Sequence, residues 1–295
     1  MSQLQHLDIH DNETKGELPK FISQIPTLQV LNLRNTALQG SILDCISNLS
    51  SLRILDLSSN RLAGNIPTKF GNLVGMIETL EKFSLPGVFI FLIEHKDLIL
   101  NWKKSKHGLP TCNLELYSLL DLLMNQLSGE IPASLGRMKS LKLLNISNNI
   151  LFGKIPVSLS DLESIKSLDL SHNKLSGLIP QSLTKLQELS VLDVSNNELT
   201  SKIPIGGQMD TMNDPNFFAN NSGLCGKQIQ VSCLEEPSPT KSSKYESKAT
   251  WFLWEGLEIG CSVGFFVTVG ILYFTGYFVL GPPPKHHSQR RRQRV

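Results

Sequence analysis

The chain has 295 residues, a formal net charge of +2 and a sequence pI near 8.2. Hydrophobic residues make up 40% of it and charged residues 18%, which excludes a wholly disordered chain. The slight basicity raises nucleic acid or a membrane as partners, depending on where the charge lies. There are 49 leucines and 20 asparagines, and 43 of the leucines precede residue 202, so repeats are expected.

A 24-residue repeat accounts for the leucines. Its seven copies begin at Leu4, Leu28, Leu52, Tyr117, Leu141, Ile165 and Leu189. Apolar residues at repeat positions 4 and 6 share one face of a short strand, because alternate side chains of a strand point the same way. The residue between them points to the other face, and it is usually aspartate, as at Asp56, Asp121, Asp169 and Asp193.

Position 9 is asparagine in six of the seven copies, and Thr36 is the exception. A side-chain amide at a turn satisfies backbone groups that a strand ladder does not reach. Stacked copies are therefore expected to form a ladder of buried asparagines, with Asn12 in the first copy. The other members are Asn60, Asn125, Asn149, Asn173 and Asn197.

Glycine at position 13 and an Ile-Pro or Leu-Pro pair follow in most copies, as in Ile66-Pro67. Proline lacks an N–H, so the pair cannot lie in a central strand, and an irregular edge is expected on the convex side. Later apolar residues, such as Phe70 and Leu73, are expected to return to the core.

The pattern LxxLxLxxNxLxGxIP resembles the leucine-rich repeat, and its Gly-x-Ile-Pro variant resembles the plant extracellular subclass. The resemblance implies an α/β solenoid: a leucine-rich-repeat superhelix of the plant 24-residue type with a concave parallel β-sheet. Stacking is required because one repeat cannot bury its apolar face alone. Residues 1–75 then hold three repeats, and residues 117–209 hold four.

Residues 76–116 interrupt the period. Their apolar stretch LPGVFIFLI is shorter than the roughly 20 residues that cross a bilayer, so a buried strand or packed loop is expected. The basic stretch that follows, with Lys103 and Lys104, is either a solvated loop or a recognition loop. An insertion before four final repeats is similar to the island of plant receptor-like proteins.

Both ends of the repeat array are informative. The period dissolves after Ile203, and residues 210–234 resemble the carboxyl-terminal cap of plant leucine-rich-repeat receptors, which implies a disulfide between Cys225 and Cys233. Cys45 and Cys112 are either buried thiols or bridged to each other. The chain starts inside the first repeat without a signal segment or cap, so it is interpreted as an amino-terminally truncated copy.

Residues 259–280 are 22 residues without a charge, which predicts one transmembrane helix. The tail, residues 281–295, carries five bases and no acid, while the stem, residues 235–258, has a net charge of −2. The positive-inside rule then predicts a single-pass type I protein of the plasma membrane with extracellular repeats. Small residues at Gly260, Gly264 and Thr268 favour helix pairing. Outside the cell, glycosylation is expected at Asn48, Asn145 and Asn220.

Catalysis and nucleic-acid binding have no support in this sequence. Residues 1–234 contain 20 bases and 21 acids, so the basicity belongs to the tail. No nucleotide-binding or hydrolase motif is present, and no cofactor is expected. His6, Asp8 and His10 share one strand face, but a metal site there is not favoured, because Asp8 occupies a repeat consensus position.

The preferred hypothesis is a non-enzymatic cell-surface receptor, as the resemblance implies. It would bind an extracellular peptide, glycan or protein, and signal in defence or development through a kinase-bearing adaptor and co-receptor that contact the membrane span and the last repeats. The alternatives are a truncated non-functional or decoy remnant, a wall-enzyme-inhibitor-like binding module, and a membrane-tethered enzyme. The residues expected to contact ligand are Lys103, Lys104, Asp121, Asn145, Asn148, Asp169, His172, Asp193 and Asn196.

Overall fold

The computed structural model describes residues 3–77, 98–102, 105–109 and 117–233. Contacts divide the chain into two units, residues 1–234 and 235–295, and every described residue belongs to the first. The apolar island stretch, Lys103, Lys104, Cys112, the stem, the expected span and the tail lie outside the described residues. Within the described part of the chain, no helix has the length and apolar character needed to cross a bilayer.

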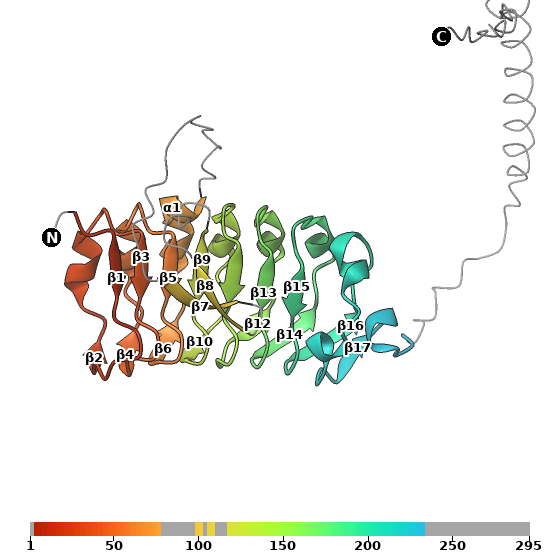
Figure 1. Cartoon of the computed structure of the whole chain (residues 1–295). Coiled ribbons are helices and arrows are strands. Elements are labelled where there is room, and N and C mark those ends of the chain that lie inside the picture. The colour runs from red at the N-terminus through yellow and green to blue at the C-terminus, as the bar shows by residue number, and fades with distance from the viewer. Residues whose placement is uncertain (1–2, 78–97, 103–104, 110–116, 234–295) are drawn as a thin grey trace, which may run out of the picture. The chain divides into compact units, whose positions relative to one another are not determined.

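Seven parallel strands, one from each repeat, form a single sheet, called here the large sheet (Figure 1). In pairing order they are β1 (His6–Asp8), β3 (Val30–Asn32), β5 (Ile54–Asp56), β9 (Leu119–Asp121), β11 (Leu143–Asn145), β13 (Ser167–Asp169) and β15 (Val191–Asp193). Strand β5 pairs directly with β9, Asp56 opposite Asp121, although residues 76–116 separate their repeats. The predicted parallel solenoid is confirmed, and the insertion does not break it.

Two smaller parallel sheets cover another side of the solenoid. One contains β2 (Gly16–Glu17), β4 (Leu38–Ser41), β6 (Arg61–Asn65) and β10 (Gln126–Ser128); the other contains β12 (Phe152–Lys154), β14 (Lys174–Leu178), β16 (Glu198–Lys202) and β17 (Gly223–Cys225). The irregular edge predicted for this side is therefore wrong. The strands end before the Ile-Pro pairs, so proline never has to donate a ladder hydrogen bond. Gly64 has a φ of +82°, which favours glycine at this point of the strand.

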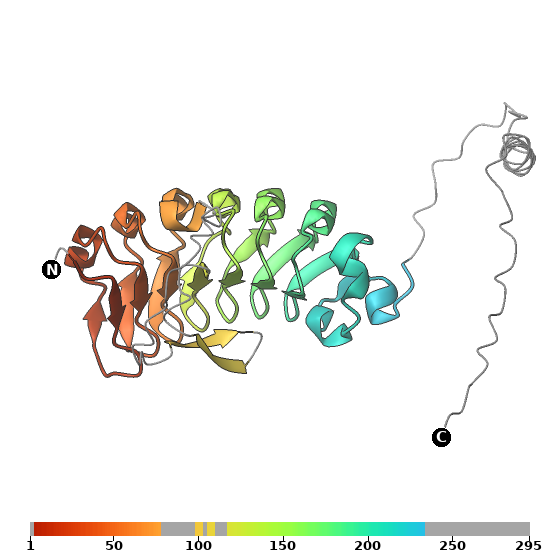
Figure 2. The ribbon, with the colours of Figure 1, turned by 45° about the horizontal axis from the view of Figure 1, so that its top comes forward.

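A short 3-10 helix follows the proline in each repeat, and the proline caps it with an extended φ and ψ, as Pro67 does. These helices are η1 (Lys20–Gln24), η2 (Asp44–Asn48), η3 (Thr68–Asn72), η5 (Ala133–Arg137), η6 (Val157–Asp161), η7 (Gln181–Lys185) and η8 (Gly207–Thr211). Figure 2 shows them stacked along the edge opposite the small sheets. Each turns an apolar residue inward, such as Phe70, which is fully buried.

The core is a continuous column of leucine and isoleucine enclosed by these layers. In the third repeat, Leu52, Leu55, Leu57 and Leu62 are all completely buried. Burying each such side chain contributes about 2 kcal/mol relative to leaving it exposed. A single repeat would leave half of this surface in water, so stacking supplies the stability.

The position-9 asparagines form a ladder that reaches backward along the chain. The Asn173 Nδ2 donates to Ile146 O of the preceding repeat at 3.1 Å, and to Leu170 O and Ser171 O of its own turn. Its Oδ1 accepts the N–H of Leu151 at 3.0 Å. Asn60, Asn125, Asn149 and Asn197 make the same set of bonds to their own neighbours.

Asn12 departs from this pattern, and the expectation that it is buried is wrong. It is exposed, and its amide donates only to Ile9 O and His10 O in its own repeat. The reason is the direction of the ladder, since the bonds that bury the other amides run to the preceding repeat, and Asn12 lies in the first repeat.

The carboxyl-terminal cap continues the period, which corrects the expectation that it dissolves after Ile203. Asn221 lies 24 residues after Asn197 and makes the ladder bonds, donating to Val194 O and accepting the Leu199 N–H, each at 3.0 Å. The cap consists of η9 (Pro215–Phe218), β17 and η10 (Lys227–Ile229). In it, Cys225 and Cys233 are joined by a disulfide. Cys45 is a half-buried free thiol.

Within the insertion, α1 (Val74–Ile77) extends the third repeat, and β7 (Leu98–Trp102) and β8 (Ser105–Leu109) pair as an antiparallel hairpin. Both views place this hairpin beside the large sheet near β5 and β9 (Figure 1, Figure 2).

Candidate functional site

The face of the large sheet that points away from the core differs in exposure along its length. At position 3, Val30, Ile54, Leu119 and Leu143 form a second buried cluster. At position 5, Asp121 is only 4% exposed. Sequence alternation predicted that this whole face is available, so the middle repeats contradict it.

Asp193, at position 5 of the last repeat, is also completely buried. Neither Asp121 nor Asp193 is therefore placed to contact a ligand, which corrects their selection as contact residues.

Burial changes the chemistry of the aspartates in the middle of the sheet. Desolvation raises the pKa of the Asp56 carboxyl, against hydrogen bonds from Ser58 that lower it. Desolvation, and then the negative charge of Asp56, raise the pKa of Asp121 well above its ordinary range. Asp121 accepts the Leu123 N–H at 3.0 Å, and the leucine side chain supplies no hydroxyl donor where other repeats have serine.

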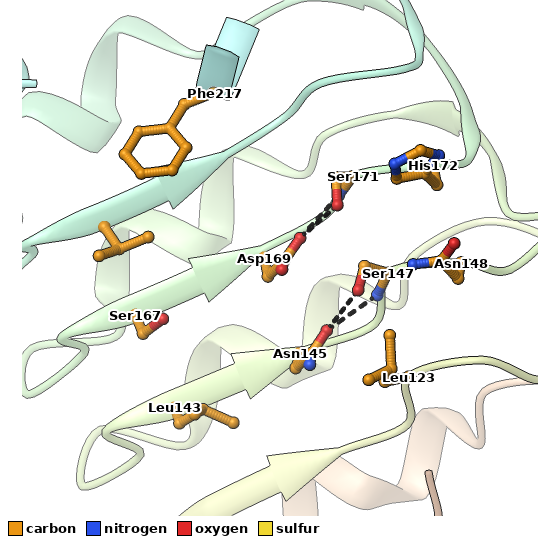
Figure 3. Close-up of a pocket in the computed structure, with 11 residues that line it drawn as sticks. Leu123, Leu143, Asn145, Ser147, Asn148, Ser167, Asp169, Ser171, His172 and Phe217 are labelled. Atoms are coloured by element: carbon orange, nitrogen blue, oxygen red, sulfur yellow. Dashed lines mark hydrogen bonds between the residues drawn. The ribbon is translucent and has the colours of Figure 1, made fainter. Parts of the chain in front are cut away.

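The face opens in the last repeats into a groove of about 410 Å³, called here the sheet groove (Figure 3). Its floor comes from β11, β13 and β15 and the turns that follow them, and its wall from the cap. The lining residues are Leu123, Leu143, Asn145, Ser147, Asn148, Ser167, Asp169, Ser171, His172, Val191 and Phe217.

Hydroxyl groups orient the position-5 side chains on the groove floor. The Asp169 Oδ1 accepts the Ser171 N–H at 3.0 Å and the Ser171 hydroxyl at 2.7 Å. Asn145 makes the same pair of contacts with Ser147, at 3.1 and 2.7 Å. Figure 3 shows the two pairs side by side on adjacent strands. Asp169 is half-buried whereas Asn145 is 9% exposed, so Asp169 is the more accessible of the two.

The rim of the groove is a second column of polar side chains, at repeat position 8. Asn148, His172 and Asn196 all have left-handed backbone, with φ between +52° and +55°, a region that asparagine and histidine tolerate better than most residues. The Asn196 Nδ2 lies 3.1 Å from the His172 Nε2, and the Asn220 Nδ2 donates to the Asn196 Oδ1 at 2.7 Å. These three expected contact residues therefore lie together at the rim.

Phe217 is the groove residue that sequence reasoning missed. It lies 24 residues after Asp193, at position 5 of the partial eighth repeat, and its ring forms the wall beside β15 (Figure 3). Counting the period once more beyond Ile203 is the signal that finds it, together with Asn221.

The structure separates the three expected glycosylation sites. Asn48 and Asn220 are exposed. Asn145 is nearly buried and its Oδ1 is occupied by Ser147, which makes it a poor acceptor in the folded chain. In the first repeat, the His10 Nδ1 lies 2.6 Å from the Asp8 Oδ1. Within the described residues, no group of three or more potential ligands is placed to hold a metal ion.

Comparison with known proteins agrees with the repeat architecture. A family model described as "Leucine rich repeat" matches residues 2–62 and 140–199. Receptor-like protein 46 of Arabidopsis thaliana is 55% identical over 293 residues, which cover 91% of this chain and 36% of that protein. This chain thus spans about a third of the length of that relative.

Solved structures of plant receptor ectodomains share the fold. The leucine-rich-repeat ectodomain of the Arabidopsis receptor kinase HAESA, in complex with an IDA peptide hormone, is similar at a TM-score of 0.59 and 30% identity, over 79% of this chain and 32% of that one. HAESA in complex with IDA and the co-receptor SERK1 is similar at a TM-score of 0.55 and 28% identity, over 76% of this chain and 30% of that one.

Proposed function

Because the chain belongs to the plant leucine-rich-repeat receptor-like proteins, we propose that it is the ligand-binding and anchoring part of a cell-surface receptor. The sheet groove takes an extracellular peptide, and the expected span anchors the chain as a type I protein of the plasma membrane. Having no kinase motif, the chain signals through a kinase-bearing partner that contacts the span and the last repeats.

One observation carries this proposal: the groove on the large sheet, built from side chains outside the core and the ladder. The core leucines and the ladder asparagines are occupied in holding the solenoid together. Ser167 and Val191, in contrast, vary at a position that is leucine in two neighbouring repeats. The HAESA ectodomain, which has the same repeat fold, is solved with a peptide hormone, which supports a peptide as the ligand class.

The experiment is to pan the full chain in detergent micelles against a phage-displayed library of random peptides. Ser167→Leu should abolish binding of the enriched peptides, because it fills the groove with a side chain that β11 already carries at the same position, Leu143. Ser176→Phe is the matched control on the small-sheet side, where Phe152 shows that phenylalanine is tolerated at that repeat position. The proposal fails if no peptide is enriched, or if Ser167→Leu leaves binding unchanged.

A further inference from the structure

The sheet groove pairs a small apolar hollow with one accessible acid. In the position-3 column of the last four repeats, serine replaces a larger apolar residue at Ser167, which lies between Leu143 and Val191 on the adjacent strands. The missing side-chain volume leaves a hollow with aliphatic sides. Asp169 lies two residues further on the same strand, so its side chain is on the same face, about 6.6 Å along.

The charge of the groove has one sign. Among the described residues that line it, Asp169 is the acid, and none is lysine or arginine. The nearest bases in sequence are engaged outside it: Lys142 lies over the Tyr117 ring at 5.6 Å from its centre, and Lys166 forms an ion pair with Glu188 at 3.5 Å. Asp193, the next position-5 acid, is completely buried. The groove therefore offers a negative site without a cation to receive a carboxylate, sulfate or phosphate.

We infer that the ligand is an extended peptide segment with an apolar side chain in the Ser167 hollow and a lysine or arginine two residues away over Asp169. This inference rests on the proposed function and narrows its ligand class. The spacing fits because an extended peptide also places side chains i and i+2 on one face about 6.6 Å apart. An anionic oligosaccharide or an acidic peptide is disfavoured by the same charge, since like charges in a groove repel.

The test uses the random library and its enriched peptides as probes, with the full chain in detergent micelles. We expect a basic residue two positions from an apolar one in the enriched set. Replacing that basic residue by norleucine should weaken binding about fivefold at low salt, as expected for a partly exposed charge pair. The loss should shrink at 0.5 M salt, where screening acts over about 4 Å.

Two variants of equal charge change separate the site from general electrostatics. Asp169→Asn should remove the fivefold difference between the basic and norleucine peptides, and it should fold, because Asn145 already makes the same hydroxyl contacts on the next strand. Asp161→Asn, an exposed acid of η6, should leave the difference intact.

The outcomes also separate this inference from the proposed function. Enriched peptides that are blocked by Ser167→Leu but carry no basic residue, or that lose the same affinity to norleucine in Asp169→Asn, overturn the inference and leave the function standing. A library that yields no binder overturns both.

Discussion

Removal of one ladder amide tests the physical account of the solenoid most directly. Asn173→Ala deletes a side chain that is 9% exposed and serves two repeats at once. The Nδ2 group holds Ile146 O and two carbonyls of its own turn, and the Oδ1 holds the Leu151 N–H. With two amide hydrogens and one acceptor lost, at about 1 kcal/mol each, the variant should lose roughly 3 kcal/mol of unfolding free energy.

The chain supplies its own graded comparison. In the second repeat, Thr36 occupies the ladder position and its hydroxyl donates to Leu33 O at 2.7 Å, so threonine can satisfy one of the carbonyls. Asn173→Thr should therefore lose about 1 kcal/mol less than Asn173→Ala, in line with one hydrogen bond kept. Lys174→Ala, an exposed neighbour, should change stability by less than about 0.5 kcal/mol.

Urea unfolding of the full chain, followed by circular dichroism, measures these differences. Amide hydrogen exchange at Leu151 gives a local readout, because its N–H loses its acceptor in Asn173→Ala and should exchange faster than its neighbours. Equal losses for alanine and threonine, or an alanine variant as stable as Lys174→Ala, would refute the ladder as a source of stability.

Three further predictions address the turn, the buried acid and the cap. Gly129→Ala should destabilise the fold by more than Gly64→Ala, which carries only the left-handed strain of about 1–2 kcal/mol, since its methyl group would also meet a side-chain oxygen at 2.4 Å; parallel urea titrations decide this. The raised pKa of Asp121 means that the folded chain binds a proton more tightly than the unfolded one, so this stability is present at low pH and lost as pH rises above 3.8. Asp121→Asn should therefore melt higher than the parent at pH 7, with the gap closing toward pH 4, and a constant gap would contradict the assignment. Replacing Cys225 and Cys233 by alanine should cost about 2–3 kcal/mol for a loop of this size, seen as a lower melting temperature that reducing agent changes in the parent but not in the variant.

The periodic features are those that the sequence determines by itself. The spacing of Leu55 and Leu57 sets the inward face of a strand, and Asn60 two turns of alternation later sets the ladder. These are local patterns that recur every 24 residues, so seven copies reinforce one interpretation. The same arithmetic, carried one repeat further, leads to Phe217 and Asn221, and the irregular composition around them concealed it.

Only the tertiary structure decided which of these positions a ligand can reach. Asp121 and Asp169 occupy the same place in the repeat, yet one is 4% exposed and the other half-buried in a groove. Asn12 and Asn173 likewise share a repeat position, and one is exposed because its amide has bonds only within its own repeat. Repeat position fixes the direction of a side chain through strand geometry, which is local. Exposure and hydrogen bonding depend on what packs against that side chain from distant segments, and no single repeat contains that information.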